Sequence, residues 1–228
     1  MIISDKHKFI FIKVPRTSST SIEKYFVDEL GLFCDPGKGP TEHRDVWSDL
    51  TTHAYDSSLH THAKAKEVME LLSSDIWNSY YKCAFVRNPW DWASSQYFWN
   101  ISSGAPPRAI FTETEAEMVI SMMKRYEFEG ATRGEAAGPL SIQCQYNYLH
   151  DDDGNRLVDF IGNYENRTED LTKIMKHLGF PDNPCEETVH FNRTFNNKMT
   201  YQEFYTDEAK EAIANAFAKD IAAFDYKF

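Results

Sequence analysis

The sequence predicts an α/β fold in which helices flank a mainly parallel central sheet. Two apolar runs, at residues 9–14 and 80–86, have the length and composition of buried strands. Each run is followed by a polar turn and then by a helical pattern, and strands that alternate with helices are typical of parallel sheets. The 228 residues are enough for one large domain, so we expect residues 1–228 to form a single domain.

The first strand leads into a hydroxyl-rich run, residues 17–21, and then into a helix. Thr20 and Glu23 have the spacing of a capping box, which predicts that this helix begins within the hydroxyl run. Gly31 is a typical stop signal at the other end of the helix. The apolar positions that predict its buried face are Ile22, Tyr25, Phe26 and Leu30.

The second strand leads into another helix, for which Asn88 is a favourable N-cap and Pro89 a favourable first residue. We expect this helix to run to about Trp99. A turn at residues 151–154 precedes a short predicted strand at 157–161. Further helices are predicted at 63–72, 114–127, 167–178 and 206–222, and loops at 34–61, 101–113 and 130–139.

The charge of the chain limits its partners. The chain has 24 Lys and Arg residues against 35 Asp and Glu residues, which gives a formal charge of −11. A surface this acidic repels nucleic acids and anionic membranes, so we expect no nucleic-acid partner. An anionic ligand would need a local pocket of positive charge.

The cysteines and the N-terminal residues indicate the compartment. The four cysteines lie far apart and form no CxxC pair, which disfavours a zinc ribbon and a disulfide framework. Residues 1–13 lack the length of a signal peptide, and no stretch approaches the roughly 18 apolar residues of a membrane span. We therefore expect a cytoplasmic protein with no membrane span. The cysteines are Cys34, Cys83, Cys144 and Cys185.

The first candidate for phosphate binding lies between the first strand and its helix, at residues 13–21. Backbone N–H groups at a helix start carry partial positive charge, and the hydroxyl groups of this run add donors. Lys13 and Arg16 supply the positive charge that the chain as a whole lacks. The segment is not a Walker loop, because the pattern GxxxxGK[ST] needs two glycines and a lysine that are missing here. The alternative is a Ser/Thr-rich cap on an ordinary helix.

The second candidate is the segment 85–91, in which Arg87 ends the second strand. Ser95 follows Arg87 by eight residues and falls on the predicted helix. An arginine fork at a strand end and a hydroxyl on the next helix can bind one phosphate together. The alternative is that Arg87 pairs with a carboxylate such as Asp91.

The two segments resemble the donor-binding loops of the sulfotransferases that use 3′-phosphoadenosine 5′-phosphosulfate (PAPS). In that family, the loop after the first strand binds the 5′-phosphosulfate and commonly reads Pro-Lys-Thr-Gly-Gly-Thr-Ser. The second segment of the family binds the 3′-phosphate through Arg-Asn-Pro and a later serine, at the spacing that Arg87 and Ser95 have here. The corresponding run of the first loop is Pro15, Arg16, Thr17, Ser18, Ser19, Thr20 and Ser21.

The first loop departs from the family's pattern in two ways. Arg16 replaces the usual lysine, which keeps the charge but changes the geometry of its donors. Ser18 and Ser19 replace glycines, so we expect the backbone to avoid the torsions that glycine alone adopts readily.

The resemblance extends over nearly the whole chain and is nearest to the carbohydrate-type sulfotransferases, both Golgi-like and bacterial. Weaker similarity covers residues 148–171 and 205–228. Asn192 and Arg193 fall where this group often has an asparagine followed by a basic residue. The resemblance implies a three-layer, P-loop-like domain. It also implies PAPS as the donor, bound by Lys13, by the first loop, by Arg87 and Ser95, and by Asn192 and Arg193.

Sulfuryl transfer to a hydroxyl needs a base for the acceptor's proton and a cation for the leaving phosphate. The resemblance assigns the cation to Arg16 and the base to His62, because carbohydrate sulfotransferases often have a histidine at this place before a helix. His60, His53 and Glu67 are the other candidates for the base. His60 and His62 could also suggest a metal, but no third and fourth ligand follow at regular spacing, so no metal is expected.

The function implied is in-line transfer of a sulfuryl group from PAPS to a hydroxyl or amine of an acceptor. The acceptor expected is a carbohydrate, a glycoconjugate or another small hydroxyl compound, held by loops within residues 34–61 and 101–142. A non-catalytic nucleotide-binding module is the main alternative, favoured only by Arg16 in place of lysine. A P-loop-like kinase is disfavoured by the missing Walker loop and by the lack of an acidic Mg²⁺ partner after a strand.

Overall fold

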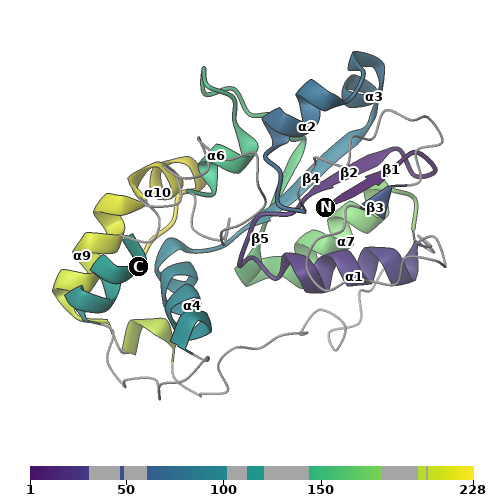
Figure 1. Ribbon diagram of the computed structural model, residues 1–228. Helices are drawn as coiled ribbons and strands as arrows, with labels where there is room; N and C mark the ends of the chain where they lie inside the picture. Colours follow the sequence, from purple (N-terminus) through teal and green to yellow (C-terminus); the bar gives the residue numbers. More distant parts are fainter. Residues whose placement is uncertain (31–46, 49–60, 102–111, 121–143, 181–199, 204) are drawn as a thin grey trace. The chain divides into compact units, whose positions relative to one another are not determined.

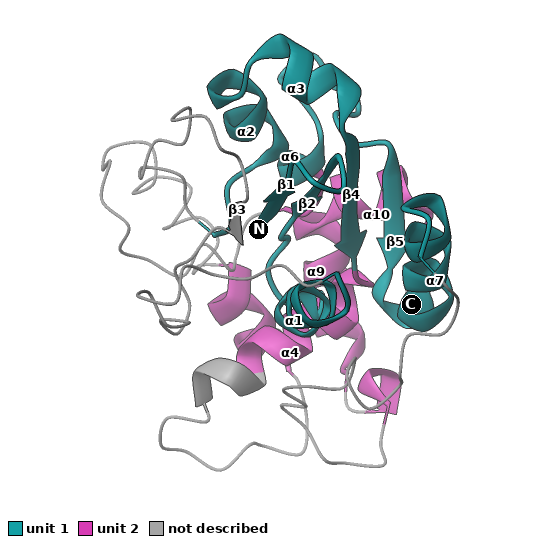
Figure 2. Ribbon diagram, turned by 90° about the vertical axis from the view of Figure 1, so that its right-hand side faces the viewer, with its two compact units in different colours: residues 1–86, 147–191 teal, residues 87–146, 192–228 magenta. Residues whose placement is uncertain are grey.

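The computed structural model describes residues 1–30, 47–48, 61–101, 112–120, 144–180, 200–203 and 205–228. The chain divides into two compact units (Figure 2). Unit 1 comprises Met1–Val86 and Asn147–Phe191, and unit 2 comprises Arg87–Tyr146 and Asn192–Phe228. The expectation of a single domain over residues 1–228 stays a prediction.

Unit 1 contains a five-stranded sheet in the order β3-β1-β2-β4-β5 (Figure 1). Strand β2 is parallel to β4, β4 to β5 and β1 to β3, whereas β1 and β2 form an antiparallel pair. The predicted α/β fold with a mainly parallel sheet between helices is thus confirmed. The strands are β1 (Ile2–Ser4), β2 (Phe9–Ile12), β3 (Trp47–Ser48), β4 (Tyr81–Val86) and β5 (Phe160–Asn163).

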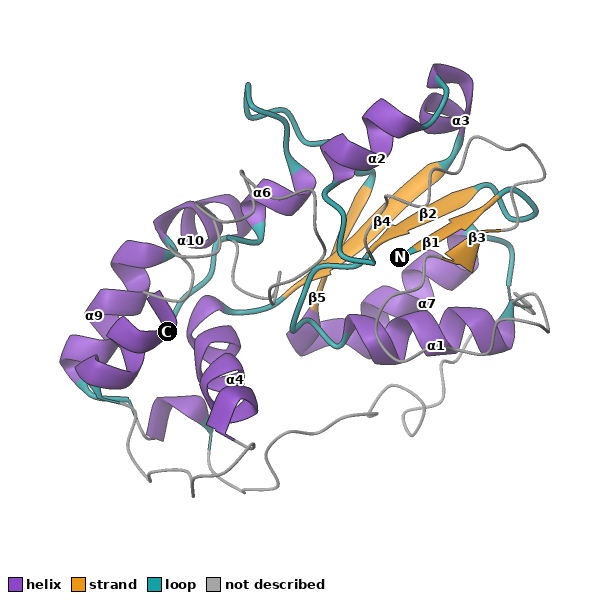
Figure 3. Ribbon diagram, viewed as in Figure 1, coloured by secondary structure: helices purple, strands orange, loops and turns teal. Residues whose placement is uncertain are grey.

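Helices cover both faces of this sheet (Figure 3). On one face, alternate side chains of β2 and β4 form a core with α1 (Ser19–Glu29) and α7 (Arg167–His177). The intervening side chains are also buried and point to the other face, where α2 (Ala65–Leu71) and α3 (Ser74–Ser79) lie. The core on the α1 side includes Phe9, Phe11, Cys83, Phe85, Ile22, Phe26, Leu171 and Ile174.

Gly162 allows β5 to pass close to β4. It lies opposite Phe85 in the sheet, and a Cβ atom built on it would lie 2.6 Å from Cε1 of the Phe85 ring. Real Cβ atoms do not approach a ring this closely, so any larger residue would displace the ring from the core.

Unit 2 is helical in its described residues. Its main helices are α4 (Pro89–Ile101), α9 (Asp207–Ala216) and α10 (Ala218–Phe224), and residues 113–120 form a further helix. The core of this unit comprises Trp90, Trp92, Ala93, Tyr97, Ala116, Val119, Ala209, Ile213 and Phe217. Shorter elements of the chain are α6 (Tyr146–Leu149) and the 3₁₀ turns η2 (Tyr164–Asn166) and η3 (Tyr201–Glu203).

Most of the helices and strands that hydrophobic periodicity predicts are present, but their ends are shifted. The strand predicted at 157–161 lies at 160–163, and the helix predicted at 206–222 is broken at Phe217 into α9 and α10. Strand β1 and helix α3 were not predicted, because each is too short to show a period. Most of the predicted loops, and the later part of the helix predicted at 114–127, lie outside the described residues.

The described helices include none that is long and apolar enough to cross a membrane.

Candidate active site

The first candidate loop continues from β2 at one edge of the sheet. Strands β2 and β4 are parallel neighbours, with Ile12 opposite Ala84, so their carboxyl ends lie at the same edge. In open α/β sheets this is the edge where ligands bind. The loop belongs to unit 1 and leads directly into α1, which begins at Ser19 as the hydroxyl run predicts.

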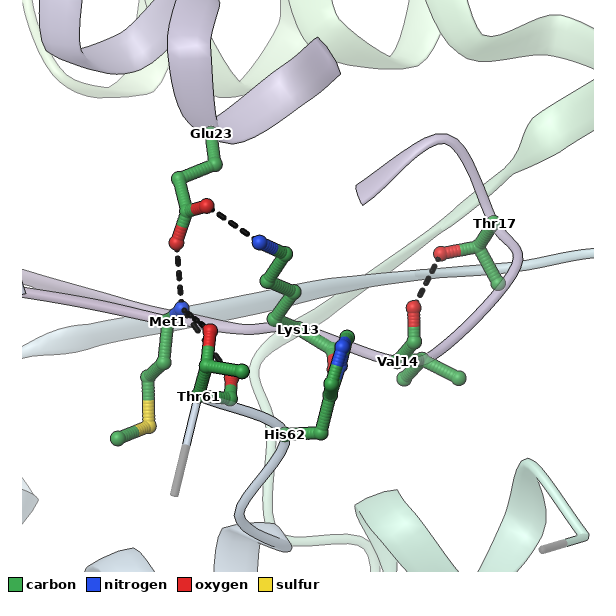
Figure 4. A network of polar contacts seen from close by, with 7 residues as sticks. All are labelled: Met1, Lys13, Val14, Thr17, Glu23, Thr61 and His62. Atoms are coloured by element: carbon green, nitrogen blue, oxygen red, sulfur yellow. Dashed lines mark hydrogen bonds and ion pairs between the residues drawn. The ribbon is translucent and has the colours of Figure 1, made fainter. Parts of the chain in front are cut away.

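The backbone of this loop is unusual. Arg16 and Ser18 have φ angles of 61° and 58°, in the left-handed region, although neither is glycine. The expectation that a serine at position 18 would avoid such torsions is therefore wrong. The Thr17 hydroxyl closes the turn by donating to the carbonyl of Val14 at 2.9 Å (Figure 4). A left-handed conformation costs an ordinary residue about 1–2 kcal/mol, so this loop holds strain.

The predicted capping box is also absent. The N-cap of α1 is Ser18, and no side-chain bond caps the helix. Glu23 is instead buried and contacts Lys13, so it is not available to cap the helix start. The signal for this contact was present in the sequence, because Glu23 lies three and seven residues before Phe26 and Leu30 on the apolar face of the helix.

The loop has the features of an anion-binding turn. The first N–H groups of a helix have no acceptor within the helix, and they carry the positive end of its dipole. Where a left-handed residue neighbours a right-handed one, successive backbone N–H groups point to the same side and form a concave site for anions. Arg16, which is half-buried as a residue, adds the positive charge of its guanidinium. These features fit a phosphate or sulfate group.

Lys13 follows β2 and is buried, with its side chain 6% exposed. Its ammonium contacts the carboxylate of Glu23, and the other oxygen of that carboxylate accepts from the Met1 amino group at 2.6 Å (Figure 4). Burial lowers the pKa of this amino group to about 5, although Glu23 opposes the shift. Glu23 therefore compensates the charge of Lys13, and a role for Lys13 in donor binding stays a prediction.

His62 lies beside the start of the loop. Its Nδ1 atom is 2.7 Å from the backbone carbonyl oxygen of Lys13 (Figure 4). A carbonyl oxygen can only accept a hydrogen bond, so Nδ1 carries the proton of this bond. In the neutral ring, Nε2 then holds the lone pair that can take a proton from another group. The bond thus fixes the tautomer of the neutral His62 ring at the end of β2, and the role of His62 as the base stays a prediction.

The neighbouring residue, Thr61, links the same segment to the sheet. The Met1 amino group donates to its carbonyl oxygen at 3.2 Å, and the Thr61 side chain is buried. The segment before α2 is thus attached both to the first residue of the chain and to the end of β2.

The other candidates for the base are either occupied or outside the described residues. A Glu67 side-chain oxygen accepts from the backbone N–H of Lys64 at 2.6 Å, so this carboxylate stabilises the first turn of α2. His53 and His60 lie outside the described residues, as do Asn192 and Arg193.

The second candidate segment begins unit 2. Asn88 and Pro89 start α4 as predicted, and the Asn88 side chain accepts from the backbone N–H of Trp90 at 3.1 Å. The Nε atom of Arg87 donates to Asp91 at 2.7 Å, so the alternative considered for Arg87, an ion pair with Asp91, is present. This bond engages the Nε donor of the guanidinium, and the anion-binding role of Arg87 stays a prediction. Ser95 is half-buried on α4.

Two residues near Arg87 had no role in the sequence analysis. The Gln145 side chain accepts from the backbone N–H of Arg87 at 2.8 Å and donates to its carbonyl oxygen at 2.7 Å. Asp220 accepts in turn from the backbone N–H of Gln145 at 3.0 Å. No local pattern could have revealed these contacts, because they join segments 58 and 75 residues apart.

The described residues contain no group of three or more His, Cys, Asp or Glu side chains that could hold a metal ion. A search of curated proteins found no match. A model of the sulfotransferase family matches residues 1–126, which are more than half of the 228 residues. This range includes the loop after β2, His62 and the segment from Arg87 to Ser95. On this match, the chain belongs to the sulfotransferase family.

Proposed function

We propose that the protein transfers a sulfuryl group from PAPS to a hydroxyl or amine of a carbohydrate or another small hydroxyl compound. Membership of the sulfotransferase family makes it a sulfuryl transferase, and the identities of donor and acceptor are the proposal. The observation that carries it is the bond from His62 Nδ1 to the carbonyl oxygen of Lys13. That bond joins a histidine whose Nε2 would accept a proton to Lys13, the residue that leads from β2 into the candidate anion-binding loop.

In this proposal, the loop after β2 binds the 5′-phosphosulfate of the donor. Its support is the start of α1, the left-handed turn at Arg16 and Ser18, and the charge of Arg16. Arg87 and Ser95 bind the 3′-phosphate, for which an arginine fork is well suited. Asn192 and Arg193 complete the set by resemblance alone.

The donor supplies the sulfuryl group, and the residues of the chain move the proton and stabilise the charge. The acceptor oxygen forms a bond to sulfur while the bond from sulfur to the bridging phosphate oxygen breaks. His62 Nε2 takes the proton of the acceptor, and Arg16 with the start of α1 stabilises the charge on the leaving phosphate. A positioned base contributes about 10²- to 10⁴-fold to such a rate.

The direct experiment supplies the protein with labelled PAPS and a panel of sugars, glycolipids, phenols and steroids, in the presence of EDTA. The proposal expects release of adenosine 3′,5′-bisphosphate that depends on the acceptor and needs no metal. Saturable binding of PAPS with no product in the presence of any acceptor would instead indicate a nucleotide-binding module. A strict requirement for Mg²⁺ would contradict the metal-free step.

A further inference from the structure

Unit 2 contains a buried carboxylate that the proposed reaction does not use. Asp220 on α10 is fully buried, and burial raises the pKa of its carboxyl group above the ordinary value. One carboxylate oxygen accepts from the backbone N–H of Tyr146 at 2.7 Å and from the thiol of Cys144 at 2.7 Å. The other accepts from the backbone N–H of Gln145 at 3.0 Å. Burying a carboxyl group is costly unless donors surround it, and these donors fix the backbone of residues 144–146 around it.

The side chain that this backbone carries, that of Gln145, is itself fully buried and points to Arg87. Its Oε1 accepts from the Arg87 N–H at 2.8 Å, and its Nε2 donates to the Arg87 carbonyl oxygen at 2.7 Å. Nε2 also lies 3.4 Å from Asp220, and only the amide nitrogen can donate to both a carboxylate and a carbonyl. The orientation of the amide is therefore determined by its partners. The Gln145 amide thus offers the Arg87 backbone one donor and one acceptor, as a residue of a neighbouring strand would.

We propose that Gln145, held in place by Asp220, is a positioning residue that fixes Arg87 for the 3′-phosphate of the donor. The inference rests on the proposed function, because it assigns the 3′-phosphate to Arg87. Arg87 is the first residue after β4, where sheet pairing has ended. Gln145 replaces that pairing for the backbone of Arg87, while Asp91 holds its Nε at 2.7 Å. Gln145 thus holds the backbone of Arg87, and Asp91 holds its side chain.

The test substitutes Gln145→Met, which keeps the length of the side chain and removes both its donor and its acceptor. Calorimetry compares adenosine 3′,5′-bisphosphate with adenosine 5′-phosphate, which lacks the 3′-phosphate, for the wild type, Gln145→Met, Arg87→Ala and the double variant. Gln145→Met should weaken the bisphosphate by about tenfold and leave the monophosphate unchanged. The double variant should bind no more weakly than Arg87→Ala alone, because the amide acts through Arg87.

Tyr205→Phe is the matched control. The Tyr205 hydroxyl donates to the carbonyl oxygen of Trp90 at 2.7 Å, so this variant loses a hydrogen bond in the same unit that does not involve Arg87. It should lower stability without changing the ratio of the two nucleotide affinities. Equal weakening of both nucleotides by Gln145→Met, or an effect that adds to that of Arg87→Ala, would overturn the positioning role.

A second readout does not depend on nucleotides. Hydrogen exchange at the Arg87 amide should be faster in Gln145→Met, because its acceptor is gone, and unchanged exchange would also overturn the inference. If Gln145→Met does not fold, Gln145→Leu takes its place, since it also lacks both the donor and the acceptor. A wild type with no preference for the 3′-phosphate would overturn the proposed function and this inference together. A normal preference that only Arg87→Ala abolishes would overturn the inference alone.

Discussion

The two candidate loops start in the same way and are stabilised differently. Each follows a buried strand and leads through a polar turn into a helix, α1 in one case and α4 in the other. The start of α4 is regular, with Asn88 as a capping residue that accepts from Trp90. The start of α1 has left-handed residues at Arg16 and Ser18 and no side-chain cap.

This difference indicates what each loop is shaped for. A helix start that served stability alone would have a side-chain cap and relaxed torsions, as α4 has. The turn before α1 instead has strained torsions, and backbone strain of this kind is common at binding sites. The segment after β4 instead obtains its order from hydrogen bonds with a distant part of unit 2, through Gln145. We therefore expect the first loop to act in the chemistry and the second to act in donor affinity.

Substitution of Arg16 separates the two loops most clearly. Arg16→Ala should lower turnover by about 10²- to 10³-fold and also weaken donor binding, because Arg16 would stabilise charge that grows on the leaving phosphate. Turnover with labelled PAPS and calorimetry with adenosine 3′,5′-bisphosphate measure the two effects. Arg16→Lys is the matched control and should keep most of the turnover, since it retains the positive charge. Near-normal turnover of Arg16→Ala would move this role to Lys13 or Arg193.

Substitution of Arg87 in the second loop should change only the affinity for the nucleotide. Arg87→Ala should weaken adenosine 3′,5′-bisphosphate by about tenfold or more and leave adenosine 5′-phosphate almost unchanged, because a charged hydrogen bond is lost only for the 3′-phosphate. Calorimetry with the two nucleotides measures this difference, and Arg156→Ala, an exposed arginine of unit 1, serves as the control. If both nucleotides weaken equally, Arg87 supports the structure and does not bind the phosphate.

The smallest effect tests the strain itself. Ser18→Gly should raise the free energy of unfolding by about 0.5–1 kcal/mol, because glycine adopts a φ of 58° without the steric cost that serine bears. Ser19→Gly is the matched control at the first helical residue, where glycine should instead destabilise the helix. Urea unfolding of both variants gives the comparison. A loss of stability in Ser18→Gly would mean that the turn before α1 is not strained.

The elements predicted from the sequence are those whose signals are local. Asn88 and Pro89 mark the start of α4 by their own chemistry, and the helix from Ser19 shows in the spacing of its apolar residues. Strand β5 begins later than predicted. The apolar residues before Phe160 resemble a strand, but the pairing with β4 begins only at Phe160. Pairing between strands depends on the partner, which a single segment does not reveal.

The sequence indicates the residue types of the candidate site but not the contacts among them. A donor-binding role for Lys13 stays a prediction, and the contact of its ammonium with the carboxylate of Glu23 was not predicted. The torsion of Ser18 could not be inferred from a local rule, because tertiary structure outweighs a cost of about 1–2 kcal/mol. The contact of Gln145 with Arg87 joins residues that only the folded chain brings together.

In the proposed reaction, His62 takes the proton of the acceptor beside a loop that binds the donor. His62→Ala should lower turnover by about 10²- to 10⁴-fold while the affinity for adenosine 3′,5′-bisphosphate stays almost unchanged, since a base acts on the acceptor. His150→Ala, a half-buried histidine of the same unit, should change neither quantity. Near-normal turnover of a folded His62→Ala variant would contradict the claim, and His60, His53 and Glu67 would then be tested in that order.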